Sequence, residues 1–595
     1  MILNLEHRIF AKKNVSKWIY FGASYFKLYL LEKKVNKKNR ISLSEKNYSN
    51  FLKEKKIFKK WLEQQRLYHK DSIFWWMNGL ASRSNLSSNF LLNVSQLSSI
   101  KEYLRDNKKI ENITIISENF HLIKFLVENL ETKYTLKVPK FFLLFLTIEK
   151  IYLIYQGLIN YLKIIYFYFS NYFFSYQTQP RTDKPEGEVY LFHDLINSSD
   201  FKEGSVQSRY FGEYPSWLEK NEKQVITLPW FYQNLDNKKK IYQSLRLRNS
   251  FIPEDWLNIS DYFQSLKFSI KSSFTLNEKI EYPSIRVLNL IRFTKLSALQ
   301  NKSAIFFRYM MALKKWSKNI TSLIFIDHYQ NQNYEHPIRY ELKNLKLPNL
   351  QSIGYYHSLH SNNFLPYMSD EKEWESKAKP DLIICPNKIC KDHLRSQGIP
   401  KNKLKVISDL QREQLFKKKN IEKKFSKNLL IMLSLFPESN YEILLKFSKI
   451  NDYLINELNL NIKIRPHPYV NINEIKRKLK WKSFPKKWKL SNEDLETDLN
   501  DSYCVVTMHS SAITDAIHFD CIALILKTEF NVAENFLDFL ENKFPLLAAT
   551  KNENLKQKLT DIYSTKKGYY KKEFINIKEF METNISKIAY QKIVD

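Results

Sequence analysis

The feature that most constrains the fold is a series of short, continuous apolar runs, separated from one another by segments with helical periodicity. Such runs are typical of parallel strands covered by helices on both faces. The first series comprises Asn112–Ser117, Val189–His193, Val225–Leu228, Ser322–Asp327, Gln351–Tyr356, Asp381–Cys385 and Lys403–Ile407. The second series comprises Asn428–Ser434, Asn461–Ile464, Tyr503–Thr507 and Cys521–Leu526. The pattern predicts an α/β chain with two doubly wound, Rossmann-like domains.

The predicted domains follow from these two series, because 595 residues are more than one hydrophobic core can hold. We expect a basic N-terminal region over 1–105, a first Rossmann-like domain over 106–408 and a second over 429–595. Residues 409–428 form a charged, glycine-free stretch that is typical of an interdomain connection. The carboxyl ends of the strands of both sheets then border a cleft, where ligands of open α/β sheets bind.

The charge of the chain is strongly positive, with 94 Lys and Arg against 62 Asp and Glu, a formal net charge of +32. Residues 1–70 alone hold 18 Lys and Arg and 5 Asp and Glu. Such an excess favours anionic partners, although the Lys, Asn, Ile, Phe and Tyr content is also what an A/T-rich genome gives. The sequence has no zinc-finger spacing, RNP-like motif or basic-region heptads, so nucleic acid is not a predicted partner.

The positions of the glycines and cysteines exclude several kinds of binding motif. The 9 glycines never lie closer than eight residues apart, which excludes a G-x-G-x-x-G fingerprint and a P-loop. A phosphate site must therefore use helix N-termini, hydroxyls, histidines and arginines. The 4 cysteines form no C-x-x-C pair, and the N-terminus shows no signal-peptide order. We expect reduced cysteines and a cytoplasmic protein.

Residues 141–176 are predicted to form an aromatic helical insertion in the first domain. Ile151–Tyr176 holds one charge, Lys163, and 11 aromatic residues. Polar residues recur at helical spacing along one face: Gln156, Asn160, Lys163, Ser170, Asn171 and Ser175. A wide apolar arc with a thin polar stripe suits a helix lying in the headgroup layer of a membrane, and equally a helix buried between domains. A spanning helix ranks third, because strands are predicted on both sides of it.

The first motif with chemical content is Ile464-Arg465-Pro466-His467-Pro468, directly after a predicted strand. The strand delivers Arg465 and His467 to the cleft, and the prolines fix the backbone. A guanidinium forms a bidentate fork for phosphate oxygens, and an imidazole is a directional donor. The alternative is a proline-rich strand exit with a solvated arginine and histidine.

The second motif is His509-Ser510-Ser511-Ala512-Ile513-Thr514-Asp515, at a predicted turn from strand to helix. Two hydroxyls and the backbone N–H groups of a helix N-terminus together grip a phosphate without glycine. The alternative is an ordinary N-cap, with Asp515 favouring the first helical turn. The two motifs follow strands of one predicted sheet, which favours a shared ligand.

The pattern of these motifs resembles the nucleotide-binding half of GT-B glycosyltransferases, in particular bacterial sialyl- and polysialyltransferase-like and polyol-phosphate transferase-like enzymes. More closely, the chain is similar to bacterial surface carbohydrate (O-antigen type) biosynthesis proteins. The resemblance spans most of the chain and also rests on Phe74-Trp75-Trp76, Ser208-Arg209-Tyr210-Phe211-Gly212, Asn331-Gln332-x-x-Glu335, Gly354-Tyr355-Tyr356-His357-Ser358, Gly398-Ile399-Pro400 and Phe536-Leu537-Asp538-Phe539-Leu540. The chain departs from the family where it has His509, often a glycine there, and Phe519-Asp520-Cys521, where a Gly-x-Pro phrase is usual.

The resemblance implies a GT-B-like fold and a glycosyltransferase that moves a sugar from a nucleotide-activated donor to a surface polysaccharide or lipid-linked acceptor (O-antigen, capsule or lipopolysaccharide). The second domain would bind the donor and the first the acceptor, at the cytoplasmic face of the membrane. The alternatives on the same fold are a CDP-polyol phosphotransferase and a nucleotide-sugar epimerase. An alternative of another class is a non-enzymatic basic protein that binds membranes or nucleic acid.

Site residues follow from the motifs. The expected nucleotide and substrate ligands are Arg209, His357, Arg465, His467, His509, Ser510, Ser511 and Asp515. An inverting transfer needs a base on the acceptor side, and we expect Glu335, followed by Asp327 and His328. His360 could orient a substrate beside His357; the alternative is that these are loop carboxylates and surface histidines. The sequence has no D-x-D triplet, so metal-independent transfer without a cofactor is predicted.

Overall fold

The structure is a computed structural model of the chain. It describes residues 2–84, 88–109, 111–178, 184–196, 201–202, 205–206, 208, 210–231, 238–247, 249–407, 409–410, 425–533, 535–565, 567–583 and 590–593. Most of the predicted linker 409–428 lies outside these residues, as does Arg209.

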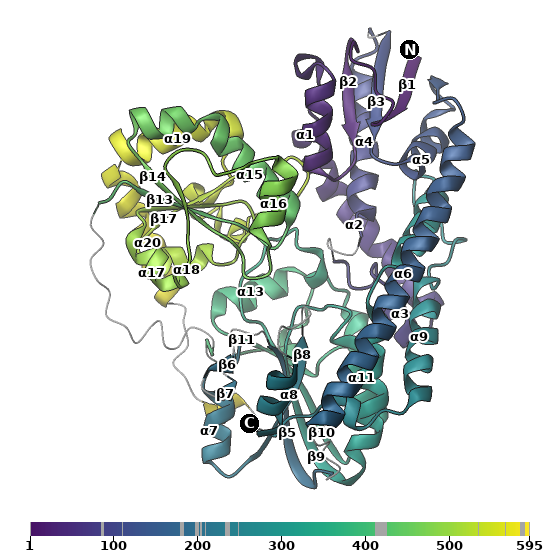
Figure 1. The fold of residues 1–595 in the computed structure, drawn as a ribbon, viewed down its shortest axis with the longest axis vertical. Helices are drawn as coiled ribbons and strands as arrows, with labels where there is room; N and C mark the ends of the chain where they lie inside the picture. The colour runs from purple at the N-terminus through teal and green to yellow at the C-terminus, as the bar shows by residue number, and fades with distance from the viewer. Residues whose placement is uncertain are drawn as a thin grey trace.

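Three parallel sheets organise the described residues (Figure 1). The first has four strands in the order β2-β3-β1-β4, which are β1 (Ile2–His7), β2 (Trp18–Phe21), β3 (Asn112–Ser117) and β4 (Thr135–Lys137). Its helices are α1 (Tyr25–Lys34), α2 (Ser44–Tyr68), α3 (Ile73–Trp76), α4 (Phe90–Asp106) and α5 (Phe120–Leu130). The predicted strand 112–117 and helix 120–130 are confirmed to the residue.

The N-terminal region differs from its prediction. We expected residues 1–105 to be a basic extension, and the strand at 112–117 to belong to the sheet of the first Rossmann-like domain. Instead β1 and β2 flank β3 in a sheet of their own. Leu3 and Leu5 alternate with half-exposed residues in β1 and are fully buried, as is Trp18 in β2. The many lysines of this region lie in helices and loops. Because they make its overall composition basic, a prediction from composition misses the short apolar strands.

The second sheet has six parallel strands in the order β12-β11-β10-β9-β5-β8. They are β5 (Gly187–Ile196), β8 (Gln224–Phe231), β9 (Ile320–His328), β10 (Asn349–Tyr355), β11 (Leu382–Cys385) and β12 (Leu404–Val406). The associated helices are α7 (Tyr214–Lys220), α8 (Lys238–Leu247), α9 (Ile259–Ser273), α10 (Leu288–Ala298), α11 (Ser303–Trp316), α12 (His336–Asn344) and α13 (Lys388–Ser396). A two-residue antiparallel pair, β6 (Phe201–Lys202) and β7 (Ser205–Val206), lies apart.

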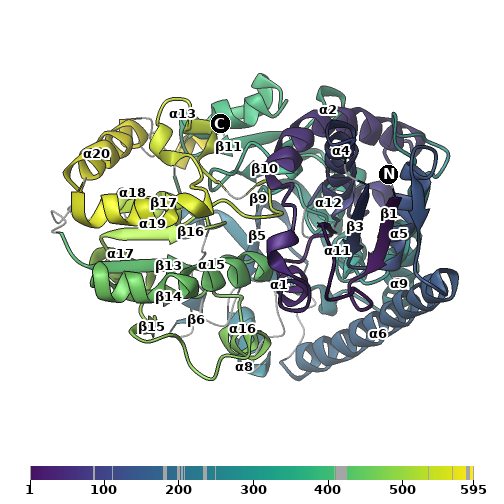
Figure 2. The same ribbon diagram turned by 90° about the horizontal axis from the view of Figure 1, so that it is seen from above.

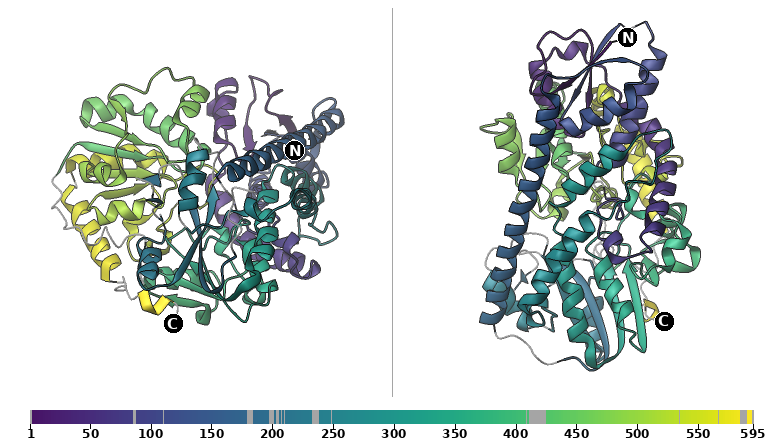
Figure 3. Two further views of the ribbon diagram at one scale, coloured as in Figure 1. Left: turned by 60° about the horizontal axis from the view of Figure 1, so that its bottom comes forward. Right: turned by 90° about the vertical axis from the view of Figure 1, so that its right-hand side faces the viewer.

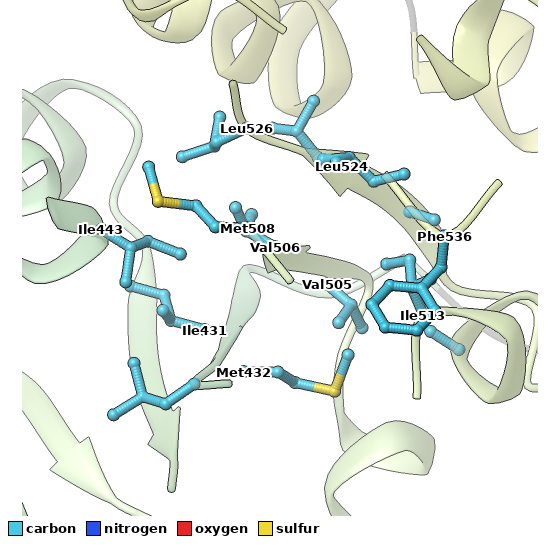
Figure 4. Close-up of a cluster of buried hydrophobic side chains, with 14 of the residues drawn as sticks. Ile431, Met432, Ile443, Val505, Val506, Met508, Ile513, Leu524, Leu526 and Phe536 are labelled. Atoms are coloured by element: carbon cyan, nitrogen blue, oxygen red, sulfur yellow. The ribbon is translucent and has the colours of Figure 1, made fainter. Parts of the chain in front are cut away.

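The third sheet has five parallel strands in the order β15-β14-β13-β16-β17. They are β13 (Asn428–Met432), β14 (Asn461–Arg465), β15 (Trp488–Leu490), β16 (Cys504–Thr507) and β17 (Ile522–Ile525). The helices are α15 (Pro437–Lys449), α16 (Ile472–Leu479), α17 (Leu495–Asp501), α18 (Ile513–His518), α19 (Leu555–Thr560) and α20 (Lys567–Thr583). Ile431, Val506 and Leu524 are paired in register across β13, β16 and β17 and lie on one buried face of this sheet (Figure 4). These two larger sheets confirm the predicted α/β fold with two Rossmann-like domains.

Helix α6 (Phe142–Gln177) is a single helix of 36 residues, and its bounds agree with the predicted helical insertion 141–176 to within one residue at each end. It leaves the four-stranded sheet after β4 and runs along the outside of the molecule to the six-stranded sheet (Figures 1 and 2). Figure 3 shows it lengthwise, beside the helices of the six-stranded domain.

The domains contact one another directly through side chains, in addition to being joined by the chain. The Glu438 carboxylate at the start of α15 accepts hydrogen bonds from the Ser24 hydroxyl at 3.0 Å and from the Phe26 N–H at 2.9 Å, at the start of α1. One hydrophobic cluster includes residues of α1, of the strands β11 and β12 and of the entire third sheet. The second and third sheets therefore have a fixed relation to one another, which gives the junction between them a defined geometry.

Candidate active site

The carboxyl ends of the second and third sheets face each other. Tyr469, four residues beyond the end of β14, packs on a cluster formed by Trp230 at the end of β8 and Tyr334 beyond β9. Phe536, beyond β17, lies with its ring centroid 5.1 Å from that of His360, beyond β10. Both domains thus contribute side chains to one junction, as the sequence predicts for a ligand site.

The wall from the six-stranded sheet is built of imidazole and aromatic rings. His328 ends β9, and its Nε2 lies 3.0 Å from the Tyr334 hydroxyl. Its ring stacks on that of Tyr210 at 4.8 Å between centroids. Tyr210 also contacts His357 at 4.7 Å, and His357 lies 6.3 Å from His360. A continuous series of rings therefore runs from the first Rossmann-like domain toward the second.

The wall from the five-stranded sheet holds the two predicted histidines. His467 follows β14, and its Nδ1 accepts the Tyr469 backbone N–H at 3.3 Å, which leaves the proton of the neutral ring on Nε2. His509 follows β16 and lies 4.8 Å from Phe536, centroid to centroid. Burial, with electrostatic repulsion from His360 and His467, lowers the pKa of His509 to about 3. His360 belongs to the second-sheet domain and His467 to the third-sheet domain, so imidazoles of both domains lower the pKa of His509.

Burial keeps this junction neutral. It lowers the pKa of His328 to about 3 and that of His360 to about 4, in each case against an opposing hydrogen bond to the backbone. His360 holds its Nδ1 2.9 Å from the Ser358 carbonyl oxygen. Neutral imidazoles present N–H donors without the desolvation cost of a buried charge.

The serine pair lies at the turn between β16 and α18, as predicted. Ser510 and Ser511 are half-buried, and neither hydroxyl caps the helix, whose N-cap residue is Ala512. The carbonyl oxygen of Ser511 instead accepts the Thr514 backbone N–H at 3.1 Å. Asp515 lies half-buried in the first turn of α18. The ordinary N-cap alternative is therefore wrong for these serines.

Arg465 does not have the role predicted for it. Its guanidinium donates to the Asp498 carboxylate at 2.6 Å and to the Glu493 carbonyl oxygen at 2.7 Å. Asp498 is fully buried and also pairs with Lys463 at 3.1 Å. Because the buried carboxylate needs compensation, it fixes Arg465 between β14 and α17.

The predicted bases Asp327 and Glu335 are also differently placed. Both are completely buried and share the guanidinium of Arg339, at 2.6 and 2.8 Å. Glu335 further accepts the backbone N–H groups of residues 330, 331 and 332 at 3.0 to 3.1 Å. Burial of two carboxyls around one guanidinium raises the pKa of both, that of Glu335 to about 7. Glu335 therefore holds its loop together, rather than facing a substrate as expected.

Sequence reasoning missed the side chains that join the two walls. Asp538 accepts the Asn362 backbone N–H at 2.8 Å and the Ser361 hydroxyl, so it fastens the loop after β10 to the third sheet. Burial raises the pKa of Asp538 to about 6. The aromatic residues of both walls were likewise not predicted as site residues. The only sequence signal for Asp538 is its place in the Phe536–Leu540 motif.

A cavity of about 240 Å³ lies beside this junction, between the first and third sheets. Phe436, Ser439 and Phe530 line it from the third domain, and Tyr25 and Leu92 from the first. Phe436 contacts His509, with ring centroids 4.3 Å apart. Phe436 thus borders both the cavity and His509, whereas none of the described histidines lines the cavity itself. Among the described residues, no group of three or more His, Cys, Asp or Glu side chains is arranged to hold a metal ion.

Comparison with known proteins gives distant structural matches. No protein-family model and no curated protein matches the chain. UDP-GlcNAc 2-epimerase from Neisseria meningitidis, solved with UDP-GlcNAc, is 12% identical with a TM-score of 0.34, over 65% of this chain and 94% of that one. MurG from Acinetobacter baumannii is 11% identical with a TM-score of 0.35, over 69% and 99%. The glycotransferase of kitacinnamycin is 8% identical with a TM-score of 0.36, over 67% and 96%. Sequence identities of 8 to 12% and TM-scores of 0.34 to 0.36 assign neither a substrate nor an activity to this chain.

Proposed function

We propose that this chain is a glycosyltransferase that moves a sugar from a nucleotide-activated donor to a growing surface polysaccharide or lipid-linked glycan. The observation that carries the proposal is the meeting of His509 of the third sheet and His360 of the second sheet at one ring, that of Phe536, with centroid distances of 4.8 and 5.1 Å. Histidines from both domains at facing strand ends suit a reaction in which each domain holds one substrate.

The donor belongs on the third sheet. The Nε2–H of His467 and the hydroxyls of Ser510 and Ser511 are the groups that would bind its phosphates. His509 adds an imidazole where related sequences often have glycine. An anion at this point would be compensated by hydrogen bonds in a dry site, where each is stronger than in water.

The acceptor belongs on the ring wall of the second sheet. A base must take the proton of its hydroxyl as the oxygen attacks the anomeric carbon and the nucleotide leaves. With Asp327 and Glu335 committed to Arg339, we assign this role to His357, which lies between the other histidines of the wall. His328 is the less suitable base because its pKa is near 3.

Nucleotide binding tests the donor site. A thermal-shift screen of the full chain against CMP, CDP, UDP, GDP and dTDP identifies the nucleotide, and calorimetry then measures its affinity. His467→Ala and Ser511→Ala should each weaken binding about 10- to 100-fold, the loss expected for one charge-assisted hydrogen bond. Two controls are His69→Ala, in the first domain, and Ser426→Ala, just before the central strand β13, at the amino ends of the strands of the same sheet.

The controls should bind like the wild type. Unchanged affinity in both His467→Ala and Ser511→Ala, or no binding of any nucleotide, would refute the donor site. Product analysis by mass spectrometry separates transfer of a sugar from transfer of a polyol phosphate and from epimerisation. Loss of activity with a chelator and recovery with Mn²⁺ would contradict the metal-independent transfer we propose.

A further inference from the structure

Helix α6 exposes an apolar side of unusual extent. Large apolar residues on one side of the helix are about half exposed or more along its whole length: Leu143, Leu144, Ile148, Ile151, Tyr152, Ile154, Tyr155, Leu158, Leu162, Tyr166, Phe169, Tyr172, Phe173 and Tyr176. The most exposed of them, Tyr166, is 74% accessible. Soluble monomers seldom expose a continuous apolar surface of this kind, so it marks an interaction surface.

The opposite side of α6 is polar and faces the protein. Asn160 donates to the backbone carbonyl oxygens of Leu299 and Asn301, both at 3.1 Å. Asn171 donates to the buried carboxylate of Glu254 at 3.4 Å. The predicted polar stripe thus contacts other helices, whereas in an ordinary surface helix the polar side faces water. An arrangement with the polar side facing the protein and the apolar side facing outward is stable only if the outward side contacts an apolar environment.

Helix α9 repeats the same inversion beside α6. It buries Ser265 and Ser269, whose hydroxyls meet Tyr168 and Tyr161 of α6 at 2.8 and 3.1 Å. Its exposed residues include the large apolar Ile259, Phe263 and Ile270, and Phe274 directly after its end is exposed as well. Two neighbouring helices therefore share a hydroxyl-lined contact and direct their apolar residues outward.

The exposed charges on and beside these two helices all have one sign. The exposed charged residues over 139–178 and 258–274 are Lys140, Lys150, Lys163, Lys267 and Lys271. The two acidic residues of these segments are compensated: Glu149 binds His121 at 2.8 Å and Asp261 pairs with Lys315. The surface thus combines apolar side chains with uncompensated positive charge, which is the composition of a helix that binds an anionic membrane surface.

We propose that the outer faces of α6 and α9 form the surface by which this protein binds a lipid bilayer that contains anionic lipids. Tyrosines suit the headgroup layer because their rings are apolar and their hydroxyls stay wet. The helix lies along the bilayer rather than across it, since both of its ends join domains that pack against each other. Its length of about 54 Å also exceeds the ~30 Å hydrocarbon core.

A second copy of the chain fits this surface less well. Two such faces would oppose five lysines to five lysines without an intervening carboxylate, and like charges across an interface cost several kcal/mol. An anionic bilayer instead complements both the apolar arc and the lysines. The proposal does not depend on the transferase chemistry, and its test uses no sugar donor.

Vesicle co-sedimentation of the full chain tests the membrane surface. The wild type should sediment with phosphatidylcholine–phosphatidylglycerol vesicles, and at least about fivefold less with phosphatidylcholine alone. Leu162→Glu with Tyr166→Glu, in the middle of the exposed arc, should reduce binding at least about tenfold. The matched control is Tyr569→Glu with Ile575→Glu, two exposed apolar residues on α20 at the far side of the molecule (Figure 2).

Each result decides the question. Loss of binding in the α6 variant and retention in the α20 variant support the proposal, provided that both melt within a few degrees of the wild type. Failure of the wild type to sediment with either vesicle overturns it, as does unchanged binding of the α6 variant. A wild-type dimer in light scattering that the α6 variant converts to a monomer, without vesicle binding, would assign the face to self-association instead.

Discussion

At the scale of single residues, the buried charges of this protein serve mainly to hold loops in place. Arg339 bridges Asp327 and Glu335 at the end of β9, and Arg465 is held by Asp498 at the end of β14. From the sequence, Asp327, Glu335 and Arg465 were candidate site residues, because each lies at or soon after the carboxyl end of a predicted strand. In the structure each instead has a buried partner of opposite charge, which fixes its position.

Replacing Glu335 tests this structural role. Glu335→Ala removes the acceptor of three backbone N–H groups and leaves Arg339 with one carboxylate, which should cost about 3–5 kcal/mol. We expect the melting temperature to fall by several degrees and soluble expression to drop. Glu371→Ala, at an exposed carboxylate, is the control and should melt like the wild type. A Glu335→Ala protein with an unchanged melting temperature and no transfer activity would restore Glu335 as the base.

At the scale of elements, α6 depends on a close approach to the helix pair α10 and α11. Gly157 is buried there, and a Cβ atom at this position would lie 2.8 Å from the Leu299 Cβ. The main chain of α6 therefore comes near enough for Asn160 to reach the carbonyl oxygens at the end of α10. A larger side chain would separate the two elements along this polar contact.

Gly157→Val should lower the melting temperature, because overpacking at a contact of this kind costs about 1–3 kcal/mol. Leu158→Val places the same β-branched residue at the next position, which is 61% exposed, and should have little effect. Equal melting temperatures for the two variants would mean that α6 does not depend on this contact.

At the scale of the whole molecule, the junction of the domains is built from histidines that folding keeps neutral. Burial lowers the pKa of six of them: His193, His328, His336, His360, His393 and His509. In the unfolded chain each takes up a proton near pH 6.5. Between that value and its lower pKa in the folded state, each histidine makes unfolding more favourable as the pH falls.

We therefore expect the free energy of unfolding to be highest above pH 6.5. Below that pH it should fall as the pH is lowered, by up to about 1.4 kcal/mol per histidine and pH unit. Buried carboxyls with raised pKa values act in the opposite direction, and between pH 7.5 and 5.5 Glu335, with a pKa of about 7, and Asp538, with a pKa of about 6, offset part of the histidine effect. Thermal melts at pH 7.5 and 5.5 should show a lower melting temperature at pH 5.5. His509→Gln should reduce the difference, and an equal or higher melting temperature at pH 5.5 would contradict the prediction.

The sequence by itself determined the strands of the two large sheets and the positions that end them. Runs such as 322–327 and 503–507 have apolar residues at consecutive positions in their middle, because both faces of these strands are buried. The helix at 120–130 was likewise predicted to the residue from its own periodicity. These features are local, because a buried strand or an amphipathic helix carries its pattern in consecutive residues.

Only the tertiary structure decided which partners the polar groups have. The carboxylate that occupies Arg465 comes from α17, 33 residues further along the chain, and no local pattern announces that contact. The sequence also predicted the polar stripe of α6 but not the side it faces, since a helix with one polar and one apolar side can be placed either way round. The asparagine and serine contacts to α9 and α10 settle that orientation. Burial is a property of single residues, whereas pairing is a property of contacts between distant segments, which form only in the folded chain.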